Sequence, residues 1–224
     1  MKNTRIKNFI RCRGIRANFY FIADSRLSRA GLINDVRQAV SAGVCAVQYR
    51  NKSASASEMF KEALKLRKLC RKVVFIINDR VDIAQAVKAD GVHLGQDDLP
   101  VSIARTIVGK DKIIGLTVHS LAQAEEAREY DIDYLGVSPV FSTKTKIDAG
   151  KPVGLSLITK IRSKCKIPIV ATGGIDLENA QDVIMAGADA LCAISAVVRK
   201  KDVGAEIGRF LKKINNGLAY RSVL

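Results

Sequence analysis

Short apolar segments alternate with longer amphipathic segments along the chain from residue 17 onward. The short segments are rich in β-branched residues and apolar at successive positions, which is typical of strands buried on both faces of a parallel sheet. Eight strands are predicted, at residues 17–24, 44–50, 73–79, 91–94, 113–117, 134–138, 169–172 and 190–195. Between them, apolar residues recur at spacings of three and four, as on the buried face of a helix. Leu32, Val36 and Val40 form one such stripe.

This strict alternation of strand and helix places the chain in the α/β class. Eight units within about 200 residues predict a closed (β/α)₈ TIM barrel. The barrel is expected to be a single domain over residues 17–224, preceded by a basic N-terminal extension at residues 1–16. The alternative is an open doubly wound sheet, which is disfavoured because no Gly-x-Gly-x-x-Gly follows the first predicted strand.

The amino-acid composition indicates the class of protein and where in the cell it is expected. Hydrophobic residues make up 48% of the 224 residues, as in ordinary globular proteins. No apolar run approaches the roughly 20 residues of a membrane helix, and the basic N-terminus lacks the apolar core of a secretory signal. The five cysteines are scattered and never spaced Cys-x-x-Cys, which disfavours a disulfide framework or a zinc site and predicts a reducing, cytoplasmic location. Cys45 and Cys192 lie in apolar runs and are expected to be buried thiols.

The net charge of +15 predicts anionic partners. Basic stretches are not interleaved with aromatic residues and the chain has no Trp, so nucleic acid is disfavoured as a partner. Small phosphorylated substrates fit the charge better. Exposed helix faces would permit a homodimer.

Polar side chains gather where the predicted strands end, which is where chemistry takes place in this type of barrel. Three carboxylates, those of Asp79, Asp97 and Asp98, follow adjacent strands. The basic side chains that could surround them are Arg50, Lys52 and Lys146. Acidic oxygens hold a hard cation and basic groups hold phosphate oxygens, so the combination predicts a polyphosphate bound through Mg²⁺. Asp79 alone could instead cap a helix that begins at Arg80.

A different pattern follows the last two strands. Gly173 and Gly174 precede one helix, and Ile194 and Ser195 precede another. Glycine lets the backbone approach a ligand and helix N-termini supply N–H donors, so this part of the rim is similar to a monophosphate cradle. The rim therefore has two predicted anion sites, one metal-assisted and one metal-free, which fits a reaction between two phosphorylated molecules.

Strand alternation assigns directions to side chains near the first site. Gln48 shares a strand face with Arg50 and is expected inside the barrel, whereas Tyr49 is expected to pack outward. His93 lies within an apolar strand and is expected to be structural rather than catalytic.

Four segments form a specific combination when taken together. They are I-I-N-D-R-V-D-I-A at 76–84, A-D-G-V-H-L-G-Q-D-D-L-P at 89–100, P-V-F-S-T-K-T-K at 139–146 and A-T-G-G-I at 171–175. The combination resembles the thiamine phosphate synthase family, and the resemblance runs in order from about residue 17 to about residue 215. It implies a (β/α)₈ barrel that joins 4-amino-2-methyl-5-hydroxymethylpyrimidine diphosphate to a thiazole phosphate, with Mg²⁺ as cofactor. The products implied are thiamine phosphate and pyrophosphate.

The resemblance also implies roles for individual residues. Those expected to bind the pyrimidine diphosphate are Gln48, Tyr49, Arg50, Asn51, Lys52, Asn78, Thr117 and Lys146. Those expected to bind the thiazole phosphate are Thr143, Lys144, Thr145, Gly174, Ile194 and Ser195. The expected metal ligands are Asp79 and Asp98, and the expected catalytic residues are Arg50, Lys52, Thr117 and Lys146. The implied reaction is ionisation at the pyrimidine methylene followed by capture by the thiazole nitrogen, which needs no protein nucleophile.

The chain departs from the family pattern at three positions. Asn51 replaces a common acidic residue, Ser138 replaces a common glycine, and Thr117 replaces the usual serine. The last change keeps the hydroxyl group and adds a methyl group, so it would tune the rate or the fit of the pyrimidine.

Two other functions on the same fold stay open. A thiazole tautomerase uses a histidine in a segment similar to residues 117–120, where this chain has His119. Such an enzyme would not need Asp98 or Lys146. A non-catalytic thiamine phosphate-binding protein would be expected to lose the metal ligands. Because Asp79 and Asp98 are both present, the synthase is favoured over both alternatives.

Overall fold

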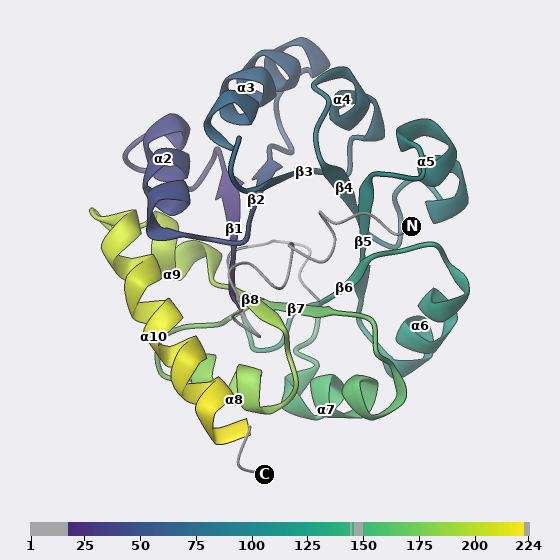
Figure 1. The fold of residues 1–224 in the computed structure, drawn as a ribbon, viewed down its shortest axis with the longest axis vertical. Helices are drawn as coiled ribbons and strands as arrows, with labels where there is room; N and C mark the ends of the chain where they lie inside the picture. The colour runs from purple at the N-terminus through teal and green to yellow at the C-terminus, as the bar shows by residue number, and fades with distance from the viewer. Residues whose placement is uncertain (1–17, 144, 146–149, 222–224) are drawn as a thin grey trace.

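The computed structural model describes residues 18–143, 145 and 150–221. Eight parallel strands form a closed barrel in which each strand pairs with its neighbours in chain order, and the last strand pairs with the first. Figure 1 looks along the barrel and shows the helices as a ring around the strands. The predicted (β/α)₈ barrel is therefore confirmed, and the open sheet is excluded because the sheet closes. The predicted extension at residues 1–16 lies outside the described residues.

The strands are short and almost entirely buried. They are β1 (Asn18–Asp24), β2 (Ala46–Arg50), β3 (Val74–Asn78), β4 (Gly91–Leu94), β5 (Ile113–Val118), β6 (Tyr134–Val137), β7 (Ile169–Thr172) and β8 (Ala190–Cys192). The prediction that strand eight continues to residue 195 is wrong, because helix α9 already begins at Ile194. Its apolar sequence runs on from β8 without a polar break, so the hydrophobic pattern does not show where the strand ends.

The helices cover the outside of the barrel (Figure 1). They are α2 (Leu32–Ala42), α3 (Ala56–Leu69), α4 (Val81–Ala86), α5 (Val101–Val108), α6 (Leu121–Glu126), η2 (Ala127–Glu129), α7 (Gly154–Lys164), α8 (Ala180–Met185), α9 (Ile194–Val198) and α10 (Val203–Arg221). Local sequence sets where they begin and end. Ser55 and Glu58 form a reciprocal capping box at the start of α3. Gly43 ends α2 in the left-handed conformation that glycine adopts without strain.

Three arginine–aspartate pairs secure the amino-terminal end of the barrel. Each aspartate immediately precedes an even-numbered strand, and its carboxylate also accepts a backbone N–H from the strand before it. The pairs are Arg67–Asp90, Arg105–Asp133 and Arg162–Asp189. The repetition ties neighbouring strands together at the end where this type of barrel is stabilised, which leaves the opposite end for chemistry.

The composition-based predictions can be checked on the described residues. Cys45 and Cys192 are buried as predicted, and no disulfide joins the cysteines that the structure describes. Within the same residues, no helix combines the length and hydrophobicity that crossing a membrane would require.

Candidate active site

Two adjoining pockets open at the carboxyl ends of the strands. The first, here called the charged pocket, encloses about 210 Å³ and is lined by Arg50, Lys52, Asp79, Asp97 and Asp98 together with seven further residues. The second, here called the hydroxyl pocket, encloses about 20 Å³ beside Thr143, Thr145 and Ser195. Ser138 lines both pockets, so groups bound in the two would meet at this residue. Two neighbouring hollows therefore lie where the sequence predicts two anion sites.

The carboxylates of the charged pocket are held close together. Asp79 directly follows β3 with a φ of 61°, a conformation that is uncommon outside glycine, and its N–H donates to the His93 carbonyl at 2.8 Å. Its carboxylate pairs with the Lys52 ammonium at 2.8 Å. Asp98 accepts the Gly95 N–H at 2.7 Å. Burial raises the pKa of the Asp98 carboxyl, and contact with Asp79 raises it further. Two adjacent carboxylates that resist sharing negative charge are suited to a cation between them.

The alternative interpretation of Asp79 as a helix cap is wrong. Helix α4 begins at Val81 with Arg80 as its N-cap residue, and no side chain caps it. The Asp79 carboxylate is turned toward Lys52 instead. The strand end therefore presents this side chain to the pocket and not to the helix.

The donor set fits a magnesium ion held partly by its substrate. Within the described residues, no cluster of three or more His, Cys, Asp or Glu side chains is arranged to hold a metal. Of the three carboxylates that line the charged pocket, those of Asp79 and Asp98 interact with each other, and the other ligands of a metal held there would be diphosphate oxygens and water. Mg²⁺ commonly binds in this way, because it keeps several waters and takes few protein ligands.

The two described cations of the charged pocket differ in their surroundings. Arg50 donates to the Asp24 carboxylate at 2.5 Å, and both side chains are almost fully buried. Lys52 is 44% exposed. The guanidinium of Arg50 is therefore held in one position, whereas the exposed side chain of Lys52 can move. Asp24 was not among the predicted site residues, although it ends β1 directly beside Arg50 in the parallel register.

Only part of the predicted pyrimidine-binding set lines the charged pocket. Arg50, Lys52, Asn78 and Thr117 do so. The other described members, Gln48, Tyr49 and Asn51, line neither pocket. Lys146 lies outside the described residues.

The side chains of those three members make contacts of other kinds. Gln48 points into the barrel and donates to the Tyr20 hydroxyl, whereas Tyr49 points outward and donates to Glu62, so both predicted directions are confirmed. Asn51 also contacts Glu62, and it accepts backbone N–H groups from its own loop. An acidic side chain at position 51 would place a second negative charge against Glu62. This contact explains why asparagine is found at this position.

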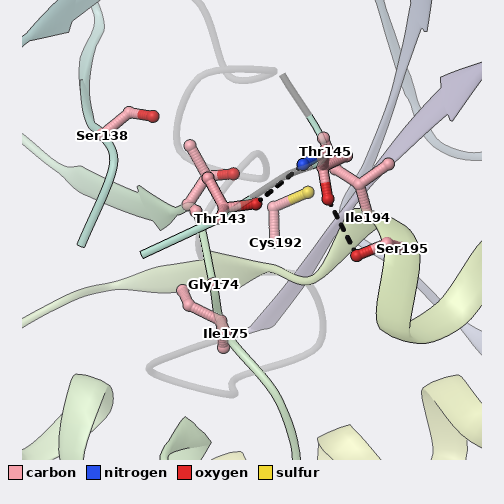
Figure 2. A pocket seen from close by; sticks show the side chains of 10 residues that line it. Ser138, Thr143, Thr145, Gly174, Ile175, Cys192, Ile194 and Ser195 are labelled. Atoms are coloured by element: carbon pink, nitrogen blue, oxygen red, sulfur yellow. Dashed lines mark hydrogen bonds between the residues drawn. The ribbon is translucent and has the colours of Figure 1, made fainter. Parts of the chain in front are cut away.

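The hydroxyl pocket contains all the predicted thiazole-phosphate residues that the structure describes. These are Thr143, Thr145, Gly174, Ile194 and Ser195, while Lys144 lies outside the described residues. Figure 2 shows the Thr145 hydroxyl donating to the Ser195 hydroxyl, at 2.9 Å, and the Thr145 N–H donating to Thr143 Oγ1, at 3.1 Å. None of the described residues that line this pocket carries a charge.

Backbone contacts between two loops shape the hydroxyl pocket. The N–H groups of Val140 and Phe141 donate to the carbonyls of Thr172 and Gly173, at 2.9 and 3.0 Å. Gly174 has a φ of 65°, and a Cβ atom there would lie 2.5 Å from the Ser142 carbonyl oxygen. Glycine is therefore required both by conformation and by space. The loops after β6 and β7 come together only because position 174 has no side chain.

Two histidines also line the charged pocket: His93, which the sequence analysis expected to be structural, and His119, the residue of the tautomerase alternative. Hydrogen bonds engage both ring nitrogens of His93, at Tyr134 and Thr117. His119 Nδ1 donates to the Ser138 carbonyl at 2.5 Å. His93 is thus structural in its contacts but lies at the pocket wall. The signal that could have found it is its place as the polar residue between Val92 and Leu94, which points it inward.

A closed parallel barrel with a carboxylate-bearing charged pocket beside a neutral hydroxyl pocket defines a (β/α)₈-barrel enzyme for phosphorylated small molecules. Residues 19–197 match the family model described as thiamine monophosphate synthase. The chain therefore belongs to the thiamine monophosphate synthase family, which confirms the resemblance seen in the sequence.

Curated relatives and solved structures agree with this assignment. The thiamine-phosphate synthase of Methanosarcina mazei is 47% identical over 94% of this chain and 85% of its own. That of Chloroflexus aurantiacus is 49% identical over 83% of this chain and 87% of its own. The structure of thiamine phosphate pyrophosphorylase from Pyrococcus furiosus superimposes with a TM-score of 0.84 at 38% identity, covering 96% of this chain and all of that one.

Proposed function

We propose that this chain is a thiamine-phosphate synthase that joins the pyrimidine diphosphate to the thiazole phosphate and releases pyrophosphate. The observation that carries the proposal is the pairing of two unlike pockets that share Ser138. One has the carboxylates and cations that a metal-bound diphosphate needs. The other has the hydroxyl groups and close backbone that a monophosphate needs. Relatives with this activity cover most of the chain.

The charged pocket would bind the diphosphate and stabilise it as it leaves. Asp79 and Asp98 would hold Mg²⁺, which supplies positive charge to the diphosphate oxygens when bound. Arg50 is held in position by Asp24 and adds a second, fixed positive charge. Lys52 leaves its contact with Asp79 to reach a phosphate oxygen. Lys146 is proposed to join them. Charges already in place cost little reorganisation when the carbon–oxygen bond breaks.

The hydroxyl pocket would hold the thiazole phosphate in reach of the pyrimidine methylene. Thr143, Thr145 and Ser195 supply hydroxyl groups, and the backbone at Gly174 approaches closely. Lys144 and Ile194 are proposed to complete this site. Holding the two reactants side by side replaces a bimolecular encounter with a positioned one, which can supply much of the rate.

The test is product formation from both substrates with and without magnesium. Purified protein would be mixed with the pyrimidine diphosphate, the thiazole phosphate and Mg²⁺, and thiamine phosphate followed by its fluorescence after oxidation. We expect product that disappears with a chelator and returns with excess Mg²⁺. Asp98→Asn is the matched variant, since it removes the charge and keeps the shape.

Failure of this test would point to a named alternative. Folded protein that makes no product but isomerises a thiazole phosphate carboxylate would be a tautomerase, with His119 as the residue to examine. Folded protein that only binds thiamine phosphate would be a binding protein. Either result would overturn the proposal.

A further inference from the structure

A row of hydrogen-bonded side chains crosses the barrel interior beneath the charged pocket. Gln48 Nε2 donates to the Tyr20 hydroxyl at 3.0 Å, and the Tyr20 and Tyr134 hydroxyls lie 2.9 Å apart. The Tyr134 hydroxyl lies 2.8 Å from His93 Nδ1, and His93 Nε2 lies 2.7 Å from Thr117 Oγ1. These five residues, here called the interior relay, come from five different strands and end at a residue that lines the pocket.

The barrel is built around the interior relay. Tyr20 and Tyr134 are almost completely buried, and the rings of Tyr134 and His93 stack with centroids 5.4 Å apart. A Cβ atom at Gly115 would lie 2.1 Å from the Tyr134 ring, and one at Gly136 would lie 2.8 Å from His93 Cε1. Two strands therefore have glycine where a larger inward side chain would displace the relay. Close packing of this kind fixes the hydrogen-bonding atoms in place.

Hydrogen-bond chemistry gives the relay a direction. An amide nitrogen can only donate, so Gln48 Nε2 occupies one acceptor position of the Tyr20 oxygen and leaves the Tyr20 hydroxyl hydrogen available to Tyr134. A Tyr134 hydroxyl that accepts from Tyr20 can in turn donate to His93 Nδ1. A neutral histidine that accepts at Nδ1 carries its hydrogen on Nε2, which donates to Thr117 Oγ1. With this direction, the hydroxyl hydrogen of Thr117 would point into the pocket that Thr117 lines.

We propose that the interior relay makes Thr117 a hydrogen-bond donor toward the diphosphate ester oxygen, with His93 and Tyr134 as positioning residues. The proposal rests on the proposed function. As the bond between the pyrimidine methylene and that oxygen breaks, its electron pair stays on the diphosphate. A donated hydrogen bond stabilises the charge that develops there, and no proton is transferred. Threonine and serine both carry a hydroxyl group, so Thr117 can donate the same hydrogen bond as the serine that is usual at this position.

The direction can be measured without substrate from the tautomers of the two histidines. His119 donates from Nδ1 to a carbonyl, so it is expected as the Nδ1–H tautomer, whereas His93 is expected as the Nε2–H tautomer. Long-range ¹H–¹⁵N correlation on ¹⁵N-histidine-labelled protein distinguishes the two, and His119→Asn assigns the signals. Opposite tautomers are the expected result. An Nδ1–H tautomer or an imidazolium at His93 would overturn the proposal.

Variants then test whether the direction matters for turnover. Tyr134→Phe removes only the hydroxyl that connects Tyr20 to His93, and Tyr20→Phe breaks the relay one step earlier. Each is expected to shift His93 toward mixed tautomers and to lower kcat about ten-fold, with the KM for thiazole phosphate unchanged within about two-fold. Tyr130→Phe is the matched control, because that hydroxyl bonds Glu126 at the surface.

The outcomes separate this proposal from the proposed function. An unchanged His93 tautomer in both relay variants would overturn the relay, whatever the rate. Wild-type protein with the expected tautomers but no synthase activity would overturn the proposed function and with it the role of Thr117 toward the diphosphate.

Discussion

The two halves of the active rim are lined by different kinds of groups. At the ends of β2 to β4, the charged pocket uses buried and half-buried ions, among them the Arg50–Asp24 pair and the Asp79–Asp98 pair. At the ends of β7 and β8, the described part of the hydroxyl pocket uses neutral hydroxyls and a glycine turn. Both halves are proposed to bind phosphate groups. On this proposal, the difference reflects what happens to each phosphate during the reaction.

The diphosphate gains negative charge in the transition state, whereas the thiazole phosphate keeps the charge it had. Only interactions that strengthen in the transition state raise the rate of the chemical step. Ions placed in the charged pocket do this, while hydroxyl and backbone donors in the hydroxyl pocket bind substrate and transition state alike. Substitutions in the charged pocket should therefore lower kcat, and those in the hydroxyl pocket should raise the KM for thiazole phosphate.

The largest effect is expected from the carboxylate pair. Asp79→Ala or Asp98→Ala should lower kcat by about a thousand-fold or more, because the metal's charge is lost where the leaving group needs it. Thiazole phosphate binding should stay within about two-fold of wild type. Steady-state kinetics and calorimetry measure the two quantities. An equal loss of thiazole phosphate binding would mean that the metal site is misplaced.

Removal of the fixed cation should have the next largest effect. Arg50→Gln should lower kcat by about a hundred-fold, as loss of a positioned electrostatic group does elsewhere. It should also lower the melting temperature, because Asp24 becomes a buried charge without its arginine. The Asp24→Asn, Arg50→Gln double variant should recover stability but not activity. Recovery of both would show that Arg50 serves only the fold.

A substitution in the hydroxyl pocket should change KM instead. Gly174→Ala brings a Cβ atom to 2.5 Å from a carbonyl oxygen and should deform the cradle. The KM for thiazole phosphate is expected to rise about ten-fold with a much smaller change in kcat. Gly43→Ala is the matched control, since it also has a positive φ but nothing within 4 Å of the new atom. A fall in kcat with unchanged KM would contradict the division of the rim.

The smallest effect is expected at His119. His119→Ala should change kcat by less than about three-fold, because the proposed reaction needs no general base at this position. The same kinetic assay measures it. Complete loss of synthase activity would contradict this and would show that His119 takes part in the reaction.

The sequence predicted the barrel because its strands are apolar on both faces and alternate strictly with helices. It also predicted the last residues of β1, β2, β4 and β7, and in a parallel barrel the strand ends meet on one rim. Side-chain contacts between residues on different strands could not be predicted from the sequence. Asp24 reaches Arg50 through the register of β1 and β2, and His93 reaches Tyr134 although 41 residues separate them.

Local ambiguity accounts for the other differences. The end of β8 and the start of α9 are both apolar, so the hydrophobic periodicity predicted a strand that extends too far. Asp79 has the chemistry of a helix cap, and only its backbone conformation and its contact with Lys52 show that it belongs to the pocket. The directions of Gln48 and Tyr49 followed from strand alternation and are correct.

The central claim is that one half of the rim depends on metal and the other does not. Calorimetric titration of the wild-type protein with each substrate alone, in Mg²⁺ and again in chelator, tests it most directly. We expect the affinity for the pyrimidine diphosphate to fall about a hundred-fold in chelator, since its charge is then only partly balanced. The affinity for the thiazole phosphate should be unchanged. Loss of both affinities together, or of neither, would contradict the account.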